Sequence, residues 1–153
     1  MTGSDLSGHF DNLVRFETEL WTAVDQRLRN EHDLPLSRFE PMQIIDRLGS
    51  CRVFDIAEAL AITVGGTSKL VDRIESSGHC RRQSNPADKR SSLIALTPDG
   101  IGLLQRAKAT FDDELARRLG SVLTPEALDR FGATLATLRE ANRRLTLITK
   151  EKA

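Results

Sequence analysis

The feature that most constrains this chain is a change of hydrophobic period in its middle. Two short amphipathic helices are predicted over residues 53–60 and 64–77, separated by a turn of a few residues. The segments 79–83 and 91–96 are short and can alternate as strands, and a polar turn containing Asn and Pro separates them. The two helices therefore form a helix-turn-helix, and the strand, basic turn and strand directly after it have the layout of a wing.

Capping residues set the predicted bounds of these helices. Thr63 is the expected N-cap of the helix that Gly78 terminates. Ser37 and Glu40 have the capping-box spacing, so we expect another helix to start near Ser37 and to end at Gly49. These short elements lie between longer helices at both ends of the chain.

The two ends of the chain are predicted as long helices. Residues 6–30 carry an apolar stripe at helical spacing, and Thr-Pro pairs open two further helices that run over about 98–120 and 125–149. The last helix has the alternating 3,4 spacing of a heptad seam, which either packing on its own domain or a second subunit would cover. A polar residue in such a seam can fix the register of a dimer. The seam starts at Leu128, and the expected dimer interface along it comprises Phe131, Leu135, Leu138, Asn142 and Leu145.

Composition fits a single globular domain over residues 1–153, with 39% hydrophobic and 29% charged residues. The sequence has no apolar run of about 18 residues, so no membrane span is expected. It also shows no secretion signal at its start. Cys51 and Cys80 do not form a framework of paired cysteines, so we expect a cytoplasmic location and two small buried thiols beside the wing sheet.

The formal net charge of zero hides a local pattern. Residues 69–90 contain six basic and three acidic residues, whereas residues 1–48 contain nine acidic and five basic ones. Local charge acts within a Debye length of roughly 10 Å, so the basic segment can attract phosphates although the whole chain is neutral. An ordinary solvated face is the alternative explanation.

The second short helix and the wing contain the residues suited to DNA. Hydroxyl and ammonium groups in the first turns of a helix can reach base edges or phosphates, and an arginine in a wing suits a narrow minor groove. Two successive glycines let backbone N–H groups approach a phosphate. An aspartate in the wing is expected to hold an arginine in a defined pose. The predicted DNA-contacting residues are Thr63, Gly65, Gly66, Thr67, Ser68, Lys69, Arg73, Arg82, Lys89 and Arg90, with Asp88 in support.

Four segments of the chain resemble the multiple-antibiotic-resistance regulator (MarR) family. The most specific part of the resemblance is an aspartate-X-arginine wing followed by a leucine-threonine-X-X-glycine helix start. The segments are DIAEAL at 55–60, TSKLVDRIESSG at 67–78, DKRS at 88–91 and LTPDG at 96–100. Two departures are the glycine pair at 65–66, where polar residues are more usual, and His79-Cys80, where two apolar residues are common.

The resemblance implies a mainly α fold with a small antiparallel β wing, in which a winged helix-turn-helix over about 37–97 lies between dimerisation helices over about 6–30 and 98–149. It implies a homodimeric, sequence-specific transcription regulator, usually a repressor, that binds a pseudo-palindromic operator in double-stranded DNA. It also implies Arg90 as the minor-groove arginine. A small aromatic or phenolic effector is expected near Arg15, Trp21 and His32.

Other classes of function find little support in the sequence. The three histidines and two cysteines are scattered, so no metal site or cofactor is expected. No glycine-rich phosphate loop or nucleophile motif is present, so the chain is not expected to be an enzyme. The neutral net charge and the glycine pair keep one alternative open, which is a winged-helix module that binds another protein, such as an antagonist of a second regulator.

Overall fold

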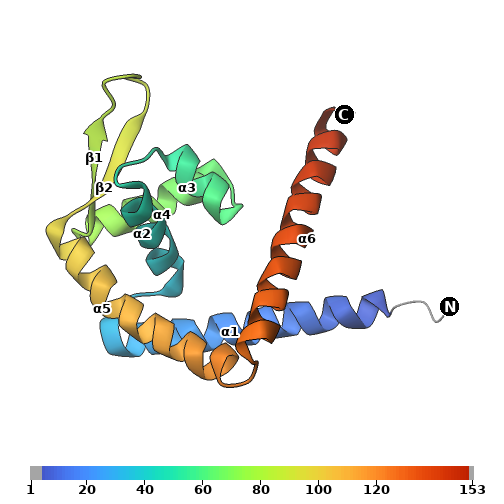
Figure 1. Ribbon diagram of the computed structural model, residues 1–153. Coiled ribbons are helices and arrows are strands. Elements are labelled where there is room, and N and C mark those ends of the chain that lie inside the picture. The colour runs from blue at the N-terminus through green and yellow to red at the C-terminus, as the bar shows by residue number, and fades with distance from the viewer. Residues whose placement is uncertain (1–4, 152–153) are drawn as a thin grey trace. The chain divides into compact units, whose positions relative to one another are not determined.

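The computed structural model describes residues 5–151, which form two compact units that divide after Asp112. The first unit contains four helices and a two-stranded sheet, followed by most of a fifth helix (Figure 1). The second contains the end of that helix, a π-helical segment and the last helix. A single domain over residues 1–153 stays a prediction. The elements are α1 (Leu6–His32), α2 (Leu36–Leu48), α3 (Val53–Leu60), α4 (Val64–Ser76), β1 (Cys80–Ser84), β2 (Ser92–Leu96), α5 (Pro98–Leu115), η1 (Ala116–Gly120) and α6 (Pro125–Glu151).

The predicted fold class of helices with a small antiparallel wing is confirmed, and one predicted cap is wrong. Helix α2 begins at Leu36 after Pro35, and no side chain caps it. The backbone N–H of Leu36 instead donates to Oδ1 of Asp25 on α1, over 2.8 Å. A carboxylate from another helix therefore takes the role expected of Ser37, because it reaches a backbone N–H that the helix leaves without a partner.

The core of the first unit lies where α2, α3, α4 and β2 meet. Phe39 of α2 is fully buried, and its ring lies 4.8 Å from the ring of Phe111 on α5. Fully burying side chains of this size stabilises the folded state by about 1.5–3 kcal/mol each. The remaining large side chains with almost no exposure are Leu28, Leu34, Met42, Ile45, Ile56, Val71, Ile74 and Ile94.

The hairpin of β1 and β2 extends beyond the helices of this unit (Figure 1). Its strands pair antiparallel, with Cys80 opposite Leu96 and Ser84 opposite Ser92. Cys51, just before α3, forms a single antiparallel bridge to Ile94 of β2. The segment before α3 is therefore attached to β2. The wing is therefore built on the same core as the two short helices.

The link between α4 and β1 is held tightly against the start of α5. The hydroxyl of Thr97 donates to the carbonyl oxygen of Gly78 over 2.6 Å, and the N–H of Thr97 donates to the carbonyl of His79. A Cβ at Gly100 would lie 2.0 Å from that same carbonyl oxygen, so only glycine fits there. The close approach couples the end of α4 to the first turn of α5.

In the second unit, α6 leaves much of its apolar seam exposed. Phe131 and Leu135 are half-buried, whereas Leu138 is 51% and Leu145 62% exposed. Asn142 is exposed on the same seam. Helix α1 of the first unit likewise exposes apolar side chains in its first half, including Phe10 at 67%.

Candidate nucleic-acid interface

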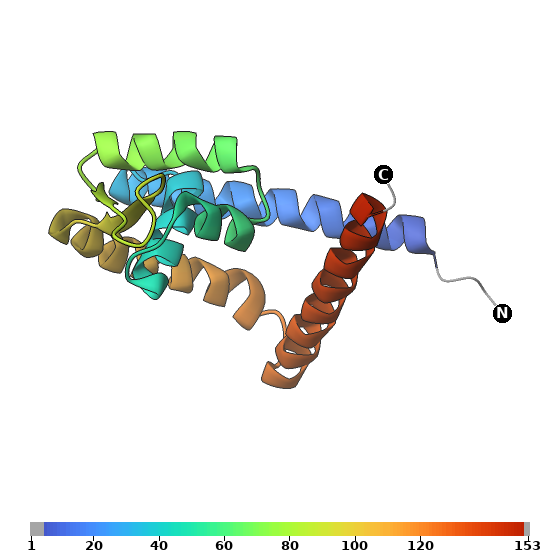
Figure 2. The same cartoon turned by 90° about the horizontal axis from the view of Figure 1, so that it is seen from above.

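Helix α4 begins with an N-cap, and its first turn contains two glycines, which have no side chain. Thr63 has extended backbone angles, and its hydroxyl accepts from the N–H of Gly66 over 3.1 Å, as the sequence predicts for an N-cap. The side chain of Val64 and the backbone of Gly65 are exposed. Helix α4 and the hairpin lie next to each other in both views (Figures 1 and 2).

Thr67 does not belong to the exposed surface of α4. The residue is fully buried, and its hydroxyl donates to the carbonyl oxygen of Thr63 over 2.8 Å. Thr67 shares its helix face with Val71 and Ile74, which are also buried. Its predicted contact with DNA is therefore wrong, and its role is packing. Lys69 and Arg73 are exposed, and Ser68 is half-buried.

The guanidinium of Arg82 forms ion pairs with two acidic residues of α4. It lies 2.7 Å from a carboxylate oxygen of Asp72 and 3.0 Å from one of Glu75, and it also donates to the carbonyl of Ser68. The backbone N–H of Arg82 donates to the second oxygen of Glu75. Partial burial lowers the pKa of Arg82, but the two carboxylates more than offset this and hold the pKa above its usual value. Arg82 thus forms a brace between β1 and α4, and its predicted contact with DNA stays a prediction.

This brace leaves the net charge of the surface unchanged and fixes where part of it lies. Of the six basic and three acidic residues in 69–90, it pairs one basic residue with two acidic ones. Five basic residues and one acidic residue lie outside the brace, whose own net charge is −1, so residues 69–90 keep the net charge of +3 that the sequence count gives. The five are Lys69, Arg73, Arg81, Lys89 and Arg90.

The turn between β1 and β2 is held by its own polar side chains. Asn85 is buried, accepts from the N–H of Ala87 over 3.1 Å and donates to the hydroxyl of Ser91 over 3.0 Å. Asp88 accepts from the backbone N–H of Arg90 over 3.0 Å. Asp88 therefore fixes the backbone at Arg90, where the sequence suggested a bond to an arginine side chain. Lys89 and Arg90 are exposed at the tip.

One basic residue near the wing was not singled out from the sequence. At the start of α3, the carboxylate of Asp55 accepts from the backbone N–H of Arg52 over 2.8 Å and from its Nη2 over 2.9 Å, and the guanidinium of Arg52 lies 5.7 Å from the ring centre of Phe54. Its pKa is raised mainly by the hydrogen bond to Asp55, with a smaller contribution from the charge of Asp88. Arg52 therefore lies close enough to the wing turn for the charge of Asp88 to act on it, a relation that no local sequence pattern contains.

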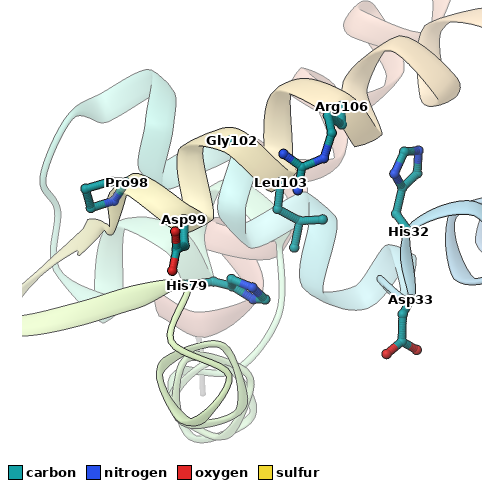
Figure 3. Close-up of a pocket in the computed structure, with 8 residues that line it drawn as sticks. All are labelled: His32, Asp33, His79, Pro98, Asp99, Gly102, Leu103 and Arg106. Atoms are coloured by element: carbon teal, nitrogen blue, oxygen red, sulfur yellow. The ribbon is translucent and has the colours of Figure 1, made fainter.

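A cavity of about 400 Å³ lies beside the link that joins α4 to β1 (Figure 3). It brings together His32 from the end of α1, His79 from the link, and Asp99 and Arg106 from α5. Only His32 of the three predicted effector residues lines it. Arg15 and Trp21 precede His32 on α1 by roughly 25 and 16 Å of helix. The remaining lining residues are Asp33, Pro98, Gly102 and Leu103.

A chain of hydrogen bonds orients His32. Arg27 donates to one carboxylate oxygen of Glu31 over 2.9 Å, and the hydroxyl of Thr110 donates to the other over 3.0 Å. The Thr110 hydroxyl has no second proton, so Nε2 of His32, 2.7 Å away, is the donor to it. In the neutral ring Nδ1 is then the acceptor. The hydrogen bonds from Arg27 and Thr110 also lower the pKa of Glu31.

The two cysteines are buried, as predicted. Burial raises the pKa of both Cys51 and Cys80 to about 11, with nearby acidic groups adding to the effect. Both are therefore protonated and unreactive near neutral pH. Within residues 5–151, no group of three or more His, Cys, Asp or Glu side chains is placed to hold a metal ion.

A family model matches the central part of the chain. The model of the MarR family matches residues 34–92, which contain α2, α3, α4 and the hairpin up to the start of β2. This part of the chain is similar to the MarR family. The match includes every exposed basic residue of α4 and of the wing turn.

MarR relatives and structures extend the likeness along the chain. The multiple antibiotic resistance protein MarR of Salmonella typhimurium is 27% identical over 94 residues, which are 61% of this chain and 65% of that protein. The match thus spans slightly less than two thirds of that relative. The MarR family regulator Sco3205 from Streptomyces coelicolor, solved in complex with DNA, has a TM-score of 0.83 at 23% identity and covers 88% of this chain and 86% of its own.

A second similar structure is BpsR of Bordetella bronchiseptica, solved to explain how 6-hydroxynicotinic acid regulates its DNA binding. It has a TM-score of 0.78 at 22% identity and covers 91% of this chain and 96% of its own. At these identities the two structures establish the fold. None of the helices in the described part of the chain has the length and hydropathy that a membrane crossing requires.

Proposed function

We propose that the chain is a homodimeric, sequence-specific DNA-binding transcription regulator that acts in the cytoplasm as a ligand-responsive repressor. The observation that carries the proposal is the arrangement of α4 and the wing turn on one unit, with Lys69, Arg73, Lys89 and Arg90 exposed. Exposed cations of this kind neutralise phosphates. The first turn of α4 is free to enter a major groove, and Arg90 suits the neighbouring minor groove.

The exposed seam of α6 supports the dimer. Leucines exposed by half or more along one helix are unfavourable in water, and a second copy of the same helix would cover them. Two copies related by a twofold axis present two winged helices, which suits the two half-sites of a pseudo-palindrome.

A gel shift with the region upstream of the chain's own gene tests the proposed surface. We expect the wild type to bind, and Lys69→Ala and Arg90→Ala each to weaken binding by about 100-fold or more, since a charge-assisted contact contributes about 1.5–3 kcal/mol and a dimer loses two. The matched control is Arg15→Ala, because Arg15 is an exposed arginine on α1. Unchanged binding by both variants would reject the surface.

The cavity beside the α4–β1 link is our proposed effector site. Arg106 can bind a carboxylate, and Asp99 or Nδ1 of His32 can accept from a ring hydroxyl or N–H. The size fits a small aromatic or phenolic acid. BpsR, which responds to 6-hydroxynicotinic acid, supports this class of ligand. Because His79 lines the cavity and its carbonyl contacts the start of α5, a ligand here would act on the end of α4.

Thermal unfolding with a panel of hydroxylated aromatic acids, starting with 6-hydroxynicotinic acid, tests the effector site. A ligand at about 100 times its Kd stabilises the folded state by about 2.7 kcal/mol, which corresponds to roughly 5–10 °C in Tm for a chain of this size. Arg106→Gln should abolish the shift, and Arg15→Gln should preserve it. A shift lost only with Arg15→Gln would move the site to the middle of α1.

A further inference from the structure

At the start of α4, exposed apolar side chains lie next to the two glycines of the first turn. Val64 is 50% exposed, and Ile62, in the turn before the cap, is 45% exposed. The exposed side chains further along α4 include the charged Lys69 and Arg73. A ligand that approaches the first turn therefore meets methyl groups, and cations lie one and two turns further on.

Gly65 is not required by the fold. A Cβ at Gly65 would meet no heavy atom within 4 Å, and its backbone is not in the left-handed region. Gly66 differs, since its Cβ would lie 3.1 Å from the capping hydroxyl of Thr63. Glycine destabilises a helix relative to alanine, so packing gives no reason for Gly65. Close approach of another molecule to the backbone does give one.

We propose that Val64, assisted by Ile62, contacts the 5-methyl group of thymine in the major groove and supplies part of the sequence preference. This inference rests on the proposed function. Thymine alone among the four bases presents a methyl group in that groove, and apolar side chains contact it. Val64 starts a column with Ser68 and Asp72 at i, i+4 and i+8, on the side of α4 that the guanidinium of Arg82 contacts. The methyl contact is therefore on the wing side of the helix.

The test compares thymine with deoxyuridine, which lacks only the methyl group. Duplexes that the protein enriches from a random library are resynthesised with either base, and Kd is measured by fluorescence anisotropy. We expect wild-type affinity to fall about fourfold for each contacted methyl group that the substitution removes, because burying one methyl group has that effect. Val64→Thr, which keeps the shape of the side chain, should bring the ratio of the two Kd values close to one. Ile62→Thr should reduce it in part.

Ile101→Thr is the matched control, because Ile101 is 40% exposed on α5 and lies outside α4. It should keep the wild-type ratio. Equal wild-type affinity for both duplexes would overturn the methyl contact and leave DNA binding intact. A ratio that Val64→Thr and Ile62→Thr leave unchanged would also overturn it, because other residues would then sense the methyl. Failure to enrich any duplex would instead reject the proposed function and favour a protein-binding winged helix.

Discussion

Leu138→Lys is expected to convert a dimer into a monomer. Leu138 lies in the middle of the exposed seam of α6, and a twofold interface would lose two leucines and gain two ammonium groups. Losing the burial of each leucine costs about 1.5–3 kcal/mol, so the dimer Kd should rise by a factor of about 100 or more. Mass measurement by light scattering after size exclusion checks this result. DNA affinity should fall with it, because each monomer carries only one winged helix.

Leu147→Lys provides the control for the seam. Leu147 is 62% exposed on the same helix but lies outside the 3,4 spacing that contains Leu138 and Asn142. It should remain dimeric, and both variants should keep the helical content of the wild type, because neither side chain is buried within the chain. A dimeric Leu138→Lys, or a monomeric wild type, would contradict the proposed interface.

Arg82→Ala is expected to destabilise the first unit and to weaken binding to DNA. It removes the side-chain contacts that join β1 to α4 and leaves the carboxylates of Asp72 and Glu75 without their cation. We expect the free energy of unfolding to fall by about 1–3 kcal/mol, measured as a lower Tm. Binding to DNA should weaken by more than the loss of one cation explains, since two uncompensated carboxylates then repel the phosphates.

Arg81→Ala is the neighbouring control. Arg81 is exposed on the opposite face of β1, so its loss should change the free energy of unfolding by less than about 0.5 kcal/mol. If Arg82→Ala kept the wild-type Tm and only reduced the salt dependence of binding, Arg82 would be a phosphate contact after all. Arg82→Lys should give an intermediate Tm, because it keeps the charge and loses the bidentate geometry.

The elements that the sequence predicted well are those with a strong local period or a cap. Thr63 caps α4 as predicted. Strand β1 lies one residue later than predicted, and β2 begins one residue later than predicted and ends at the predicted residue. The same helical and strand periods could have shown that two of the predicted DNA-contacting residues lie on inward-facing sides of their elements. Thr67 precedes the buried Val71 by four residues, so it shares that helix face. Arg82 follows the buried Cys80 by two, so both point from β1 toward α4.

Other features depend on contacts that no local pattern contains. Asp25 of α1 caps α2 across 11 residues, and the bond between His32 and Thr110 spans 78. The cavity likewise combines residues from α1, the α4–β1 link and α5. Such features follow from how the elements pack, and hydrophobic period reports only which face of each element is buried.

The salt dependence of DNA binding tests most directly whether α4 and the wing turn form the DNA-binding surface. Lys69, Arg73, Lys89 and Arg90 of two subunits would neutralise about eight phosphates, which predicts a slope of about −7 for log K against log salt concentration. Lys69→Ala should make the slope shallower by about 2, because the dimer loses two cations. A slope near zero, or one that Lys69→Ala and Arg90→Ala both leave unchanged, would contradict this account.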